Sequence, residues 1–434
     1  MVNPNIFLNQ LEIDAIKSRL GQEPWKTAYN KFMSDNVPVA MNTGIQSVTY
    51  GGVTPPSGDS HDYYSSTPAS GGERADYMAI IAVSNAVRDL GLAYVLTGDG
   101  KYANKAIQLI NGWCVNSDTK MTPRWWYSGQ NGQVWIELPV TLPGMFYGAD
   151  LIWNYSGWSL TDRDAFKNWV STLLINKGQG LSPCNTTQNY DSWRIVFGLA
   201  AASITDNQSE IDWCISSWKG LIDCQQDSNG SFYRERTRCE GGLAYSMFNL
   251  KAWTLAAEIA RHKGGTGTDL YSYKTSSGKG LELGFDFHAP YVTNQDSWSY
   301  TKCTCANCRP IDCSSDANGA VYELAYIWKQ KSGYINAVTL GCGRPKYDNR
   351  IMGPVTLTHT IGTGGTVGYG CVNNVCTPNA GSLPFGCNNI CGDGGGGTGC
   401  PTGQIYVLGS CRKTGDVLVV AGIGFILLVS ILKK

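Results

Sequence analysis

The sequence predicts an all-α domain over about residues 10–345, built from successive helical hairpins. Apolar residues recur there at helical spacing over long stretches, and short turns link one stretch to the next. Beyond about residue 345 the chain becomes rich in glycine and cysteine and loses this periodicity. Hairpins that follow one another with short links favour an α/α arrangement, closed or horseshoe-shaped, with a cleft at the helix ends.

The first hairpin is predicted at residues 75–113, where apolar side chains repeat on both sides of a turn at residues 97–100. A third helix is predicted to follow, with Thr161 as its N-cap and Asp164 three residues on. The core face of this helix consists of Phe166, Trp169, Val170, Leu173 and Leu174.

Three more helices are predicted between residues 188 and 264. The first opens with the polar letters QNYDS and continues as an apolar run from Trp193. The second, over residues 210–224, carries on one face Ile211, Ile215, Trp218 and Ile222. The third covers residues 241–264 and is stopped by Gly264 and Gly265.

Charge and cysteine content narrow the class of protein. Basic and acidic residues balance at 34 each, so the sequence shows no basic surface for nucleic acid, and we expect no nucleic-acid partner. The 16 cysteines favour an oxidising compartment. One loop contains Cys303, Cys305, Cys308 and Cys313; we expect disulfides there, because the spacing is unusual for zinc and brings no histidine.

Two further regions are predicted after the helical domain, which we assign to residues 1–345. Residues 346–414 are typical of a Gly/Cys-rich linker or stalk, or of a small disulfide-tied module. Residues 415–434 predict a C-terminal transmembrane segment, apolar from Val417 to Leu432 and followed by Lys433 and Lys434. Such a helix would be about 24 Å long, slightly less than the hydrocarbon core. A buried packing helix is the alternative.

These features predict a cell-surface or extracellular protein, held to a membrane by its C-terminal helix. The first residues show no basic segment followed by an apolar one, so no signal peptide is visible. A tail-anchored viral (virion) or archaeal surface protein, a truncated start, or a C-terminal sorting signal would each reconcile the two observations.

The candidate site begins at the polar mouth of the helix after residue 188. Asp191 or Ser192 can cap this helix, which leaves Asn189 and Tyr190 to face a cleft. Some fifty residues on, Arg238 precedes Tyr245 by seven residues, which is two helical turns along one face.

An amide, two phenols and a guanidinium suit β-elimination on a uronic acid polymer. This reaction removes the C5 proton beside a carboxylate and expels the O4 oxygen. Arginine and an amide donor can offset the charge of the carboxylate as negative charge develops. A tyrosine can remove one proton and return another when a nearby cation favours its ionised form. The chemistry requires no metal and no organic cofactor.

The chain resembles the alginate lyase family of polysaccharide lyases over about residues 3–345. The resemblance rests on the order of several motifs: the opening helix with its Glu-Pro-Trp, RDLGLAYVLTGDGKYANKAIQLINGW, LPGMFYGADLIW, the helix mouth with Asn189, and the helix that follows Arg238 and contains Tyr245. It implies an incomplete (α/α) toroid and a lyase that acts on alginate or a similar anionic polysaccharide.

The same resemblance implies roles for individual residues. Asn189 would bind the substrate carboxylate, Arg238 would help to neutralise it, and Tyr245 would act as acid and also as base. One position departs from the family pattern, which has Asn-His before a tryptophan three residues later; here Tyr190 stands between Asn189 and Trp193. Tyr190 acts as the base itself, stacks on sugar, or marks a different substrate.

Further aromatic and basic residues are candidates for binding the polymer, because aromatic faces stack on pyranose rings. They are Trp193, Arg124, Trp125, Trp126, Tyr127, His288, Trp298 and Tyr300.

Two other functions fit parts of the sequence. A non-catalytic glycan-binding surface or virion protein on a lyase scaffold is favoured by Tyr190 in place of histidine. A hydrolase would need two carboxylates about 5–10 Å apart, for which Asp150, Glu137 and Glu240 are the acidic residues to test.

Overall fold

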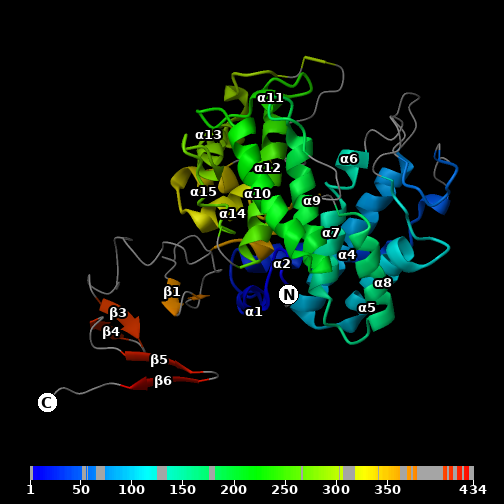
Figure 1. Ribbon diagram of the computed structural model, residues 1–434, viewed down its shortest axis with the longest axis horizontal. Coiled ribbons are helices and arrows are strands. Elements are labelled where there is room, and N and C mark those ends of the chain that lie inside the picture. Colours follow the sequence, from blue (N-terminus) through cyan, green and yellow to red (C-terminus); the bar gives the residue numbers. More distant parts are fainter. Residues whose placement is uncertain are drawn as a thin grey trace. The chain divides into compact units, whose positions relative to one another are not determined.

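The computed structural model divides the chain into two compact units, Met1–Gly365 and Thr366–Lys434. The structure describes residues 3–361 apart from 51–54, 56, 65–73, 125–133, 175–180, 265–266, 303, 306–317 and 341, and beyond residue 361 it describes six short strands. The helices and strands are labelled in Figure 1.

The first unit is built from helices in its described residues, as predicted. Its α-helices are α1 (Gln10–Lys17), α2 (Trp25–Lys31), α3 (Val37–Asn42), α4 (Ala75–Thr97), α5 (Gly100–Ile110), α6 (Val134–Glu137), α7 (Leu142–Leu151), α8 (Leu160–Ser171), α9 (Asn189–Thr205), α10 (Gln208–Gln225), α11 (Tyr233–Arg236), α12 (Gly242–Arg261), α13 (Leu281–Thr293), α14 (Val321–Trp328), α15 (Ser332–Thr339) and α16 (Val355–Thr358).

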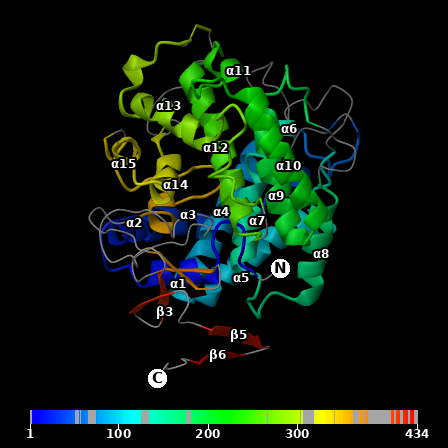
Figure 2. The same cartoon turned by 60° about the vertical axis from the view of Figure 1, so that its left-hand side comes forward.

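An inner set of helices forms the core of this unit. Helices α4, α7, α9 and α12 lie beside one another in that order, and Figures 1 and 2 both show α9 next to α12. Every residue of α7 is buried, and so is every residue of α12 from Gly242 to Ala260. A helix that is apolar and buried all round must be enclosed by other elements.

An outer set of helices packs against the inner one and buries a single stripe. Helix α5 packs on α4, helices α8 and α10 pack on α9, and α13 packs on α12. In α10 the buried stripe includes Ile211, Ile215, Trp218 and Ile222, the face predicted from the sequence. The alternation of inner and outer helices confirms the predicted α/α hairpins.

Two glycines let the inner helices α4 and α7 approach closely. A methyl group on Gly148 would lie 2.3 Å from the carbonyl oxygen of Val87, and one on Gly91 would lie 2.7 Å from the carbonyl oxygen of Gly148. These distances are far below van der Waals contact, so this crossing requires residues without a Cβ.

Several predicted helix boundaries shift in the structure: α8 ends at Ser171, before its predicted core residues Leu173 and Leu174, and α12 ends at Arg261 and not at residue 264. The turn at residues 97–100 is present, with Gly98 in the left-handed conformation at φ 75°. Helix α8, however, begins two residues earlier than predicted, because the hydroxyl of Ser159 and not of Thr161 accepts the N–H of Asp162. Its predicted core residues Phe166, Trp169 and Val170 are buried.

A buried ionic cluster joins the two ends of the first unit. Arg261, near the end of α12, donates to Glu12 in α1 at 2.6 Å and to Glu258 at 2.5 Å. His262 Nε2 lies 2.8 Å from Glu12, and His359 Nε2 lies 3.2 Å from Glu258.

The first unit extends beyond the boundary predicted at residue 345. Residues 346–361 are part of its core: Lys251 pairs with Asp348 at 2.8 Å, and both side chains are buried. Residues 351–361 are buried throughout. The glycine-rich composition that follows concealed the fact that this segment is still packed.

The second unit contains strands where an apolar C-terminal helix was expected. The antiparallel pairs are β1 (Tyr369–Val372) with β2 (Val375–Pro378), β3 (Gln404–Val407) with β4 (Ser410–Lys413), and β5 (Leu418–Gly422) with β6 (Phe425–Val429). The run from residue 417 is rich in β-branched residues and has glycines at its centre, a pattern that suits a hairpin.

Among the described residues one helix, α4, is long and apolar enough to cross a membrane. About two thirds of its most apolar window, 67%, is buried inside the protein. This is the behaviour expected of a core helix.

Candidate functional site

The predicted site residues come together where the N-terminal ends of α9 and α12 meet the short helix α11. Figure 1 shows α11 above the adjacent ends of these two inner helices. Asn189 is the first residue of α9, Tyr245 lies in the first turn of α12, and Arg238 lies in the loop between α11 and α12.

Arg238 and Tyr245 are in direct contact, although Arg238 lies in the loop before α12 and not on one helical face with Tyr245 as predicted. The guanidinium carbon of Arg238 lies 4.1 Å from the centre of the Tyr245 ring, a distance at which cation and ring attract each other. Tyr245 is 7% exposed, so most of its ring is covered. The guanidinium also donates to Gln188 at 3.3 Å and to Glu240 at 3.4 Å.

Asn189 is held by Glu235, a residue that the sequence did not single out as part of the site. The backbone N–H and the side-chain Nδ2 of Asn189 donate to the two carboxylate oxygens of Glu235 at 2.7 and 2.8 Å. Both residues are 1% exposed. The carboxylate therefore fixes the position of the amide, and the second N–H of Nδ2 is left for another acceptor.

Negative charge surrounds the Arg238 guanidinium. Partial burial disfavours its charged form, but Tyr245, Glu235 and Glu240 together raise the pKa of Arg238 above its usual value. Arg238 thus keeps a permanent positive charge beside the ring of Tyr245.

The first turn of α9 differs in detail from the predicted cap. Asp191 accepts the N–H of Gln188 at 3.4 Å and the hydroxyl of Thr187 at 2.9 Å, so it contributes to the cap as expected. Ser192 does not cap the helix; its hydroxyl is buried and donates to Gln225. Tyr190 is half-buried and lies next to Asn189.

Three of the predicted substrate-binding residues lie in the core, which corrects that prediction. Trp193 is 0% exposed and packs on Phe248, with ring centres 4.8 Å apart. Trp298 is 1% exposed, and His288 is 0% exposed between the rings of Phe232 and Trp298. Aromatic side chains at helical spacing fill cores more often than clefts.

His288 is also electrostatically unsuited to bind an anionic sugar. Burial lowers its pKa to about 4. Its Nδ1 lies 2.8 Å from the carbonyl oxygen of Gly284 and donates to it. The ring is therefore neutral near pH 7 and serves packing.

The remaining predicted binding residues have different outcomes. Tyr300 is half-buried and lies beneath the guanidinium of Arg236, 4.8 Å from its carbon. Arg124 is exposed and pairs with Asp59 at 3.0 Å. The predicted residues Trp125, Trp126 and Tyr127 lie outside the described residues.

The carboxylates considered for a hydrolase are committed to other groups. Glu137 is buried; it accepts the phenol of Tyr63 at 2.6 Å and pairs with Arg74. Asp150 is buried and accepts the backbone N–H groups of Asn5 and Ile6. Glu240 pairs with Arg238. None of the three forms an opposed pair across a cleft with another.

A disulfide lies close to the Asn189 segment. Cys184, five residues before Asn189, is bonded to Cys224 in α10, with an S–S distance of 2.04 Å. Among the four clustered cysteines predicted to form disulfides, Cys303, Cys308 and Cys313 lie outside the described residues.

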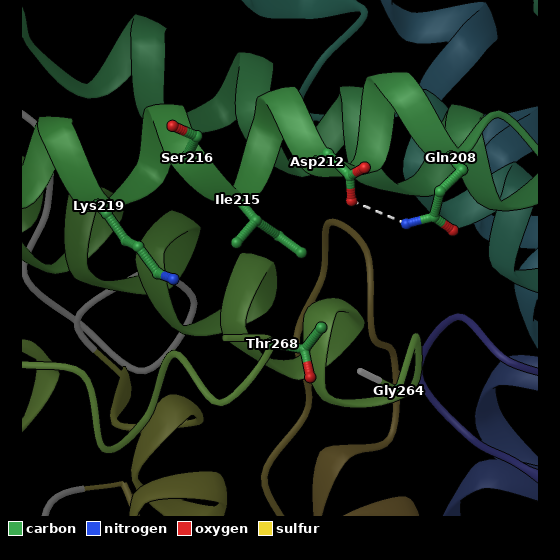
Figure 3. Close-up of a pocket in the computed structure, with 7 residues that line it drawn as sticks. All are labelled: Gln208, Asp212, Ile215, Ser216, Lys219, Gly264 and Thr268. Atoms are coloured by element: carbon green, nitrogen blue, oxygen red, sulfur yellow. Dashed lines mark hydrogen bonds between the residues drawn. The ribbon is translucent and has the colours of Figure 1, made fainter. Parts of the chain in front are cut away.

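A surface pocket elsewhere in the first unit, of about 370 Å³, carries no comparable chemistry. It is lined by α10 and by the segment after α12, as Figure 3 shows. Its acidic residue, Asp212, accepts a hydrogen bond from Gln208 at 2.8 Å. Lys219 lies 5.4 Å from the centre of the Tyr273 ring.

Comparison with known proteins agrees with this architecture. The family described as Alginate lyase matches residues 29–298. No curated protein matches the sequence.

Solved structures of alginate lyases have a similar fold. An alginate lyase from Bacteroides ovatus is 22% identical, with a TM-score of 0.69 over 83% of this chain and 100% of that one. Alginate lyase A1-III from Sphingomonas species A1 is 18% identical, with a TM-score of 0.56 over 77% of this chain and 93% of that one. An A1-III variant with a histidine replaced by alanine, complexed with tetrasaccharide, is 17% identical, with a TM-score of 0.60 over 84% and 98%.

These structures confirm the predicted α/α toroid fold. The family match covers more than half of the sequence and includes Asn189, Arg238 and Tyr245. This chain therefore belongs to the alginate lyase family of polysaccharide lyases.

Proposed function

We propose that this protein cleaves an anionic uronate polymer, alginate or a similar polysaccharide, by β-elimination. The observation that carries the proposal is the contact between Arg238 and Tyr245, 4.1 Å from guanidinium carbon to ring centre, beside the amide of Asn189. A cation next to a phenol stabilises negative charge on it electrostatically. This is what a tyrosine needs in order to exchange protons with a sugar.

In the proposed reaction the uronate carboxyl lies against Arg238 and the second Nδ2–H of Asn189. A phenolate oxygen takes the C5 proton, the electron pair forms the C4–C5 double bond, and the C4–O4 bond breaks. A phenol returns a proton to O4. Tyr245 fills at least one of these roles, and Tyr190 is the candidate for the other. No step passes through a metal ion or an organic cofactor.

The experiment that tests this proposal measures the ultraviolet absorbance of the unsaturated uronate product. The full chain is supplied with polymannuronate, polyguluronate and glucuronan. We expect a rise on at least one polymer, and Tyr245→Phe and Arg238→Ala should each slow it by roughly 10²–10⁴-fold. Tyr29→Phe on α2, a helix that lies well apart from α11 in Figures 1 and 2, is the matched control and should leave the rate unchanged. Reducing ends without absorbance would contradict β-elimination.

A second candidate is a glycan-binding protein without turnover, favoured by Tyr190 in the place of the family histidine. Under this alternative the polymer binds, and Tyr245→Phe changes nothing because no product forms. Tyr190→His would then be expected to confer lyase activity on an otherwise silent site. Full activity of the natural chain would exclude this candidate.

We further propose that the protein works in an oxidising, extracellular compartment. The Cys184–Cys224 disulfide supports this proposal, because such bonds persist mainly outside the reducing cytosol. Membrane anchoring through residues 415–434 stays a prediction. Finding the full chain in the cytosol, with Cys184 and Cys224 reduced, would contradict an extracellular location.

A further inference from the structure

We propose that Cys239 and Cys305 are a cross-linking site, at which a disulfide fixes the loop that carries Arg238. Cys239 directly follows Arg238, and Cys305 belongs to the segment after Trp298. The two sulfur atoms lie 2.7 Å apart and both residues are thiols in this structure. Non-bonded heavy atoms are normally about 3.5–4 Å apart, so the distance between these two sulfur atoms is shorter than an ordinary non-bonded contact.

Backbone contacts on both sides of the cysteine pair hold the two segments together. Thr304 N–H donates to the carbonyl oxygen of Cys239 at 2.8 Å, and Gly242 N–H donates to the carbonyl oxygen of Thr301 at 3.0 Å. The sulfurs therefore meet because the chains run side by side, and bond formation requires a movement of less than about 1 Å to reach the usual ~2.0 Å.

A zinc site is the competing explanation, because Glu240 supplies a third ligand atom within 4.8 Å of the two sulfurs. Tetrahedral zinc holds each thiolate at about 2.3 Å, which places two bound sulfurs roughly 3.8 Å apart. The observed separation is more than 1 Å shorter. Glu240 also pairs with Arg238 at 3.4 Å. The geometry favours the disulfide.

The cross-link would act on a solvent-exposed loop of the site. Thr237 and Cys239 are exposed, and Arg238 is held by two hydrogen bonds of 3.3 and 3.4 Å. The bond would join positions 66 residues apart in sequence, so it removes much of the freedom of this loop. Cys184–Cys224 already restrains the segment before Asn189 in the same manner.

The bond forms by thiol–disulfide exchange with a small-molecule disulfide, such as oxidised glutathione. The thiolate of Cys239, having lost its proton to solvent, attacks one sulfur of the reagent and releases one glutathione thiolate. Cys305 loses its proton to solvent, and its thiolate attacks the Cys239 sulfur of the mixed disulfide. The Cys239–Cys305 bond forms, and the second glutathione leaves as a thiolate that takes up a proton. Two protein thiols are oxidised and one reagent disulfide is reduced to two thiols.

The first experiment measures the bond directly in the full chain. The protein is incubated with oxidised glutathione, digested without reduction, and analysed by mass spectrometry for a peptide that joins Cys239 to Cys305. We expect this peptide in most molecules and its absence in Cys239→Ser and Cys305→Ser. Either cysteine bonded mainly to Cys303, Cys308 or Cys313, or one zinc per chain that Cys239→Ser loses, would overturn the proposal.

The second experiment measures the loop, using trypsin cleavage after Arg234, Arg236 and Arg238. We expect the oxidised chain to be cut here at least about fivefold more slowly than Cys239→Ser. Cys305→Ser and the double variant should match Cys239→Ser, because a cross-link is lost completely when either partner is lost. Circular dichroism verifies that the variants fold, and equal cleavage rates in folded wild-type and variant chains would contradict a restrained loop.

An activity measurement extends the test and alone rests on the proposed function. If the chain is a lyase, Cys239→Ser should lower kcat/KM by about tenfold, because Arg238 is less well placed. Neither the linked peptide nor the cleavage rate depends on turnover, so an inactive chain would leave the cross-link itself fully testable.

Discussion

At the scale of single residues, the buried carboxylate of Glu235 supports two groups of the site, Asn189 and Arg238. Its two oxygens accept hydrogen bonds from the backbone and side-chain N–H groups of Asn189. Burial alone would lower the pKa of Arg238, but the charge of Glu235 contributes to raising it above its usual value. One buried carboxylate thus connects the amide and the guanidinium, which lie 49 residues apart in the sequence.

We expect Glu235→Gln to lower kcat by about 10–100-fold while KM changes less. The substitution keeps the shape of the side chain but replaces a charged acceptor by an amide, and hydrogen bonds to charged groups contribute roughly 1.5–3 kcal/mol. Glu282→Gln on α13, whose carboxylate pairs with the surface residues Lys329 and Lys331, is the control. Wild-type kinetics in Glu235→Gln would show that Asn189 is positioned without this carboxylate.

The sequence was sufficient to predict Asn189, Arg238 and Tyr245 as neighbours but not what supports them. Arg238 and Tyr245 are only seven residues apart in the sequence, so their contact is local, although Arg238 lies in the loop before α12 and not on a shared helical face. Gln188 and Glu235 act through contacts that cross 50 and 46 residues, and no local pattern encodes such distances. Residue type alone also does not distinguish an aromatic side chain that stacks on a sugar from one that fills the core. The sequence therefore wrongly assigned substrate binding to Trp193, His288 and Trp298.

At the scale of elements, the crossing of α4 and α7 depends on two glycines. Sequence periodicity located α4, whereas α7 was marked only by the LPGMFYGADLIW motif of the family resemblance. Neither signal states which face of one helix meets the other. Gly91 and Gly148 lie where the two backbones approach, and this close contact was visible only in the folded chain.

We expect Gly148→Ala to destabilise the protein by about 1–3 kcal/mol, because overpacking forces backbone to move. The added methyl group would lie 2.3 Å from the Val87 carbonyl oxygen. Gly220→Ala in α10 is a matched control, since nothing lies within 4 Å of its new methyl group; it should stabilise by roughly 0.5–1 kcal/mol. Urea unfolding of both variants measures the difference, and equal midpoints would contradict the tight crossing.

The C-terminal region shows where a local pattern is ambiguous. An apolar run of this length is compatible with a helix or with buried strands, and we predicted a helix from hydropathy. The structure has β5 and β6 instead. Their antiparallel register places Gly422 opposite Phe425.

At the scale of the whole molecule, the cluster around Arg261 links the first helix of the unit to its last residues. Burial alone would raise the pKa of Glu12, but Arg261 and His262 lower it to about 2. The folded state therefore holds the Glu12 proton less tightly than the unfolded chain does. This preference stabilises the fold above the usual glutamate pKa of 4.5 and is lost as the pH falls towards 2.

We expect the free energy of unfolding to decrease by on the order of 3 kcal/mol over this window because of Glu12. In Glu12→Gln the decrease between about pH 4.5 and pH 2 should be smaller, and the variant should be less stable than the natural chain at pH 7. Urea unfolding at a series of pH values measures both effects. Parallel pH profiles for the two chains would show that Glu12 is not ionised in the folded protein.

The hydrogen bonds between Asn189 and Glu235 have one more consequence, for how the proposed polymer substrate would be attracted. The first turn of a helix is a natural seat for an anion, because its N–H groups and dipole point outward. In α9 the chain's own carboxylate occupies that seat. In the proposed reaction, recognition of an incoming uronate would therefore fall to side chains, with Arg238 foremost, and not to fixed backbone groups. Preference among acidic polymers can then change by single substitutions, while the helical frame stays as it is.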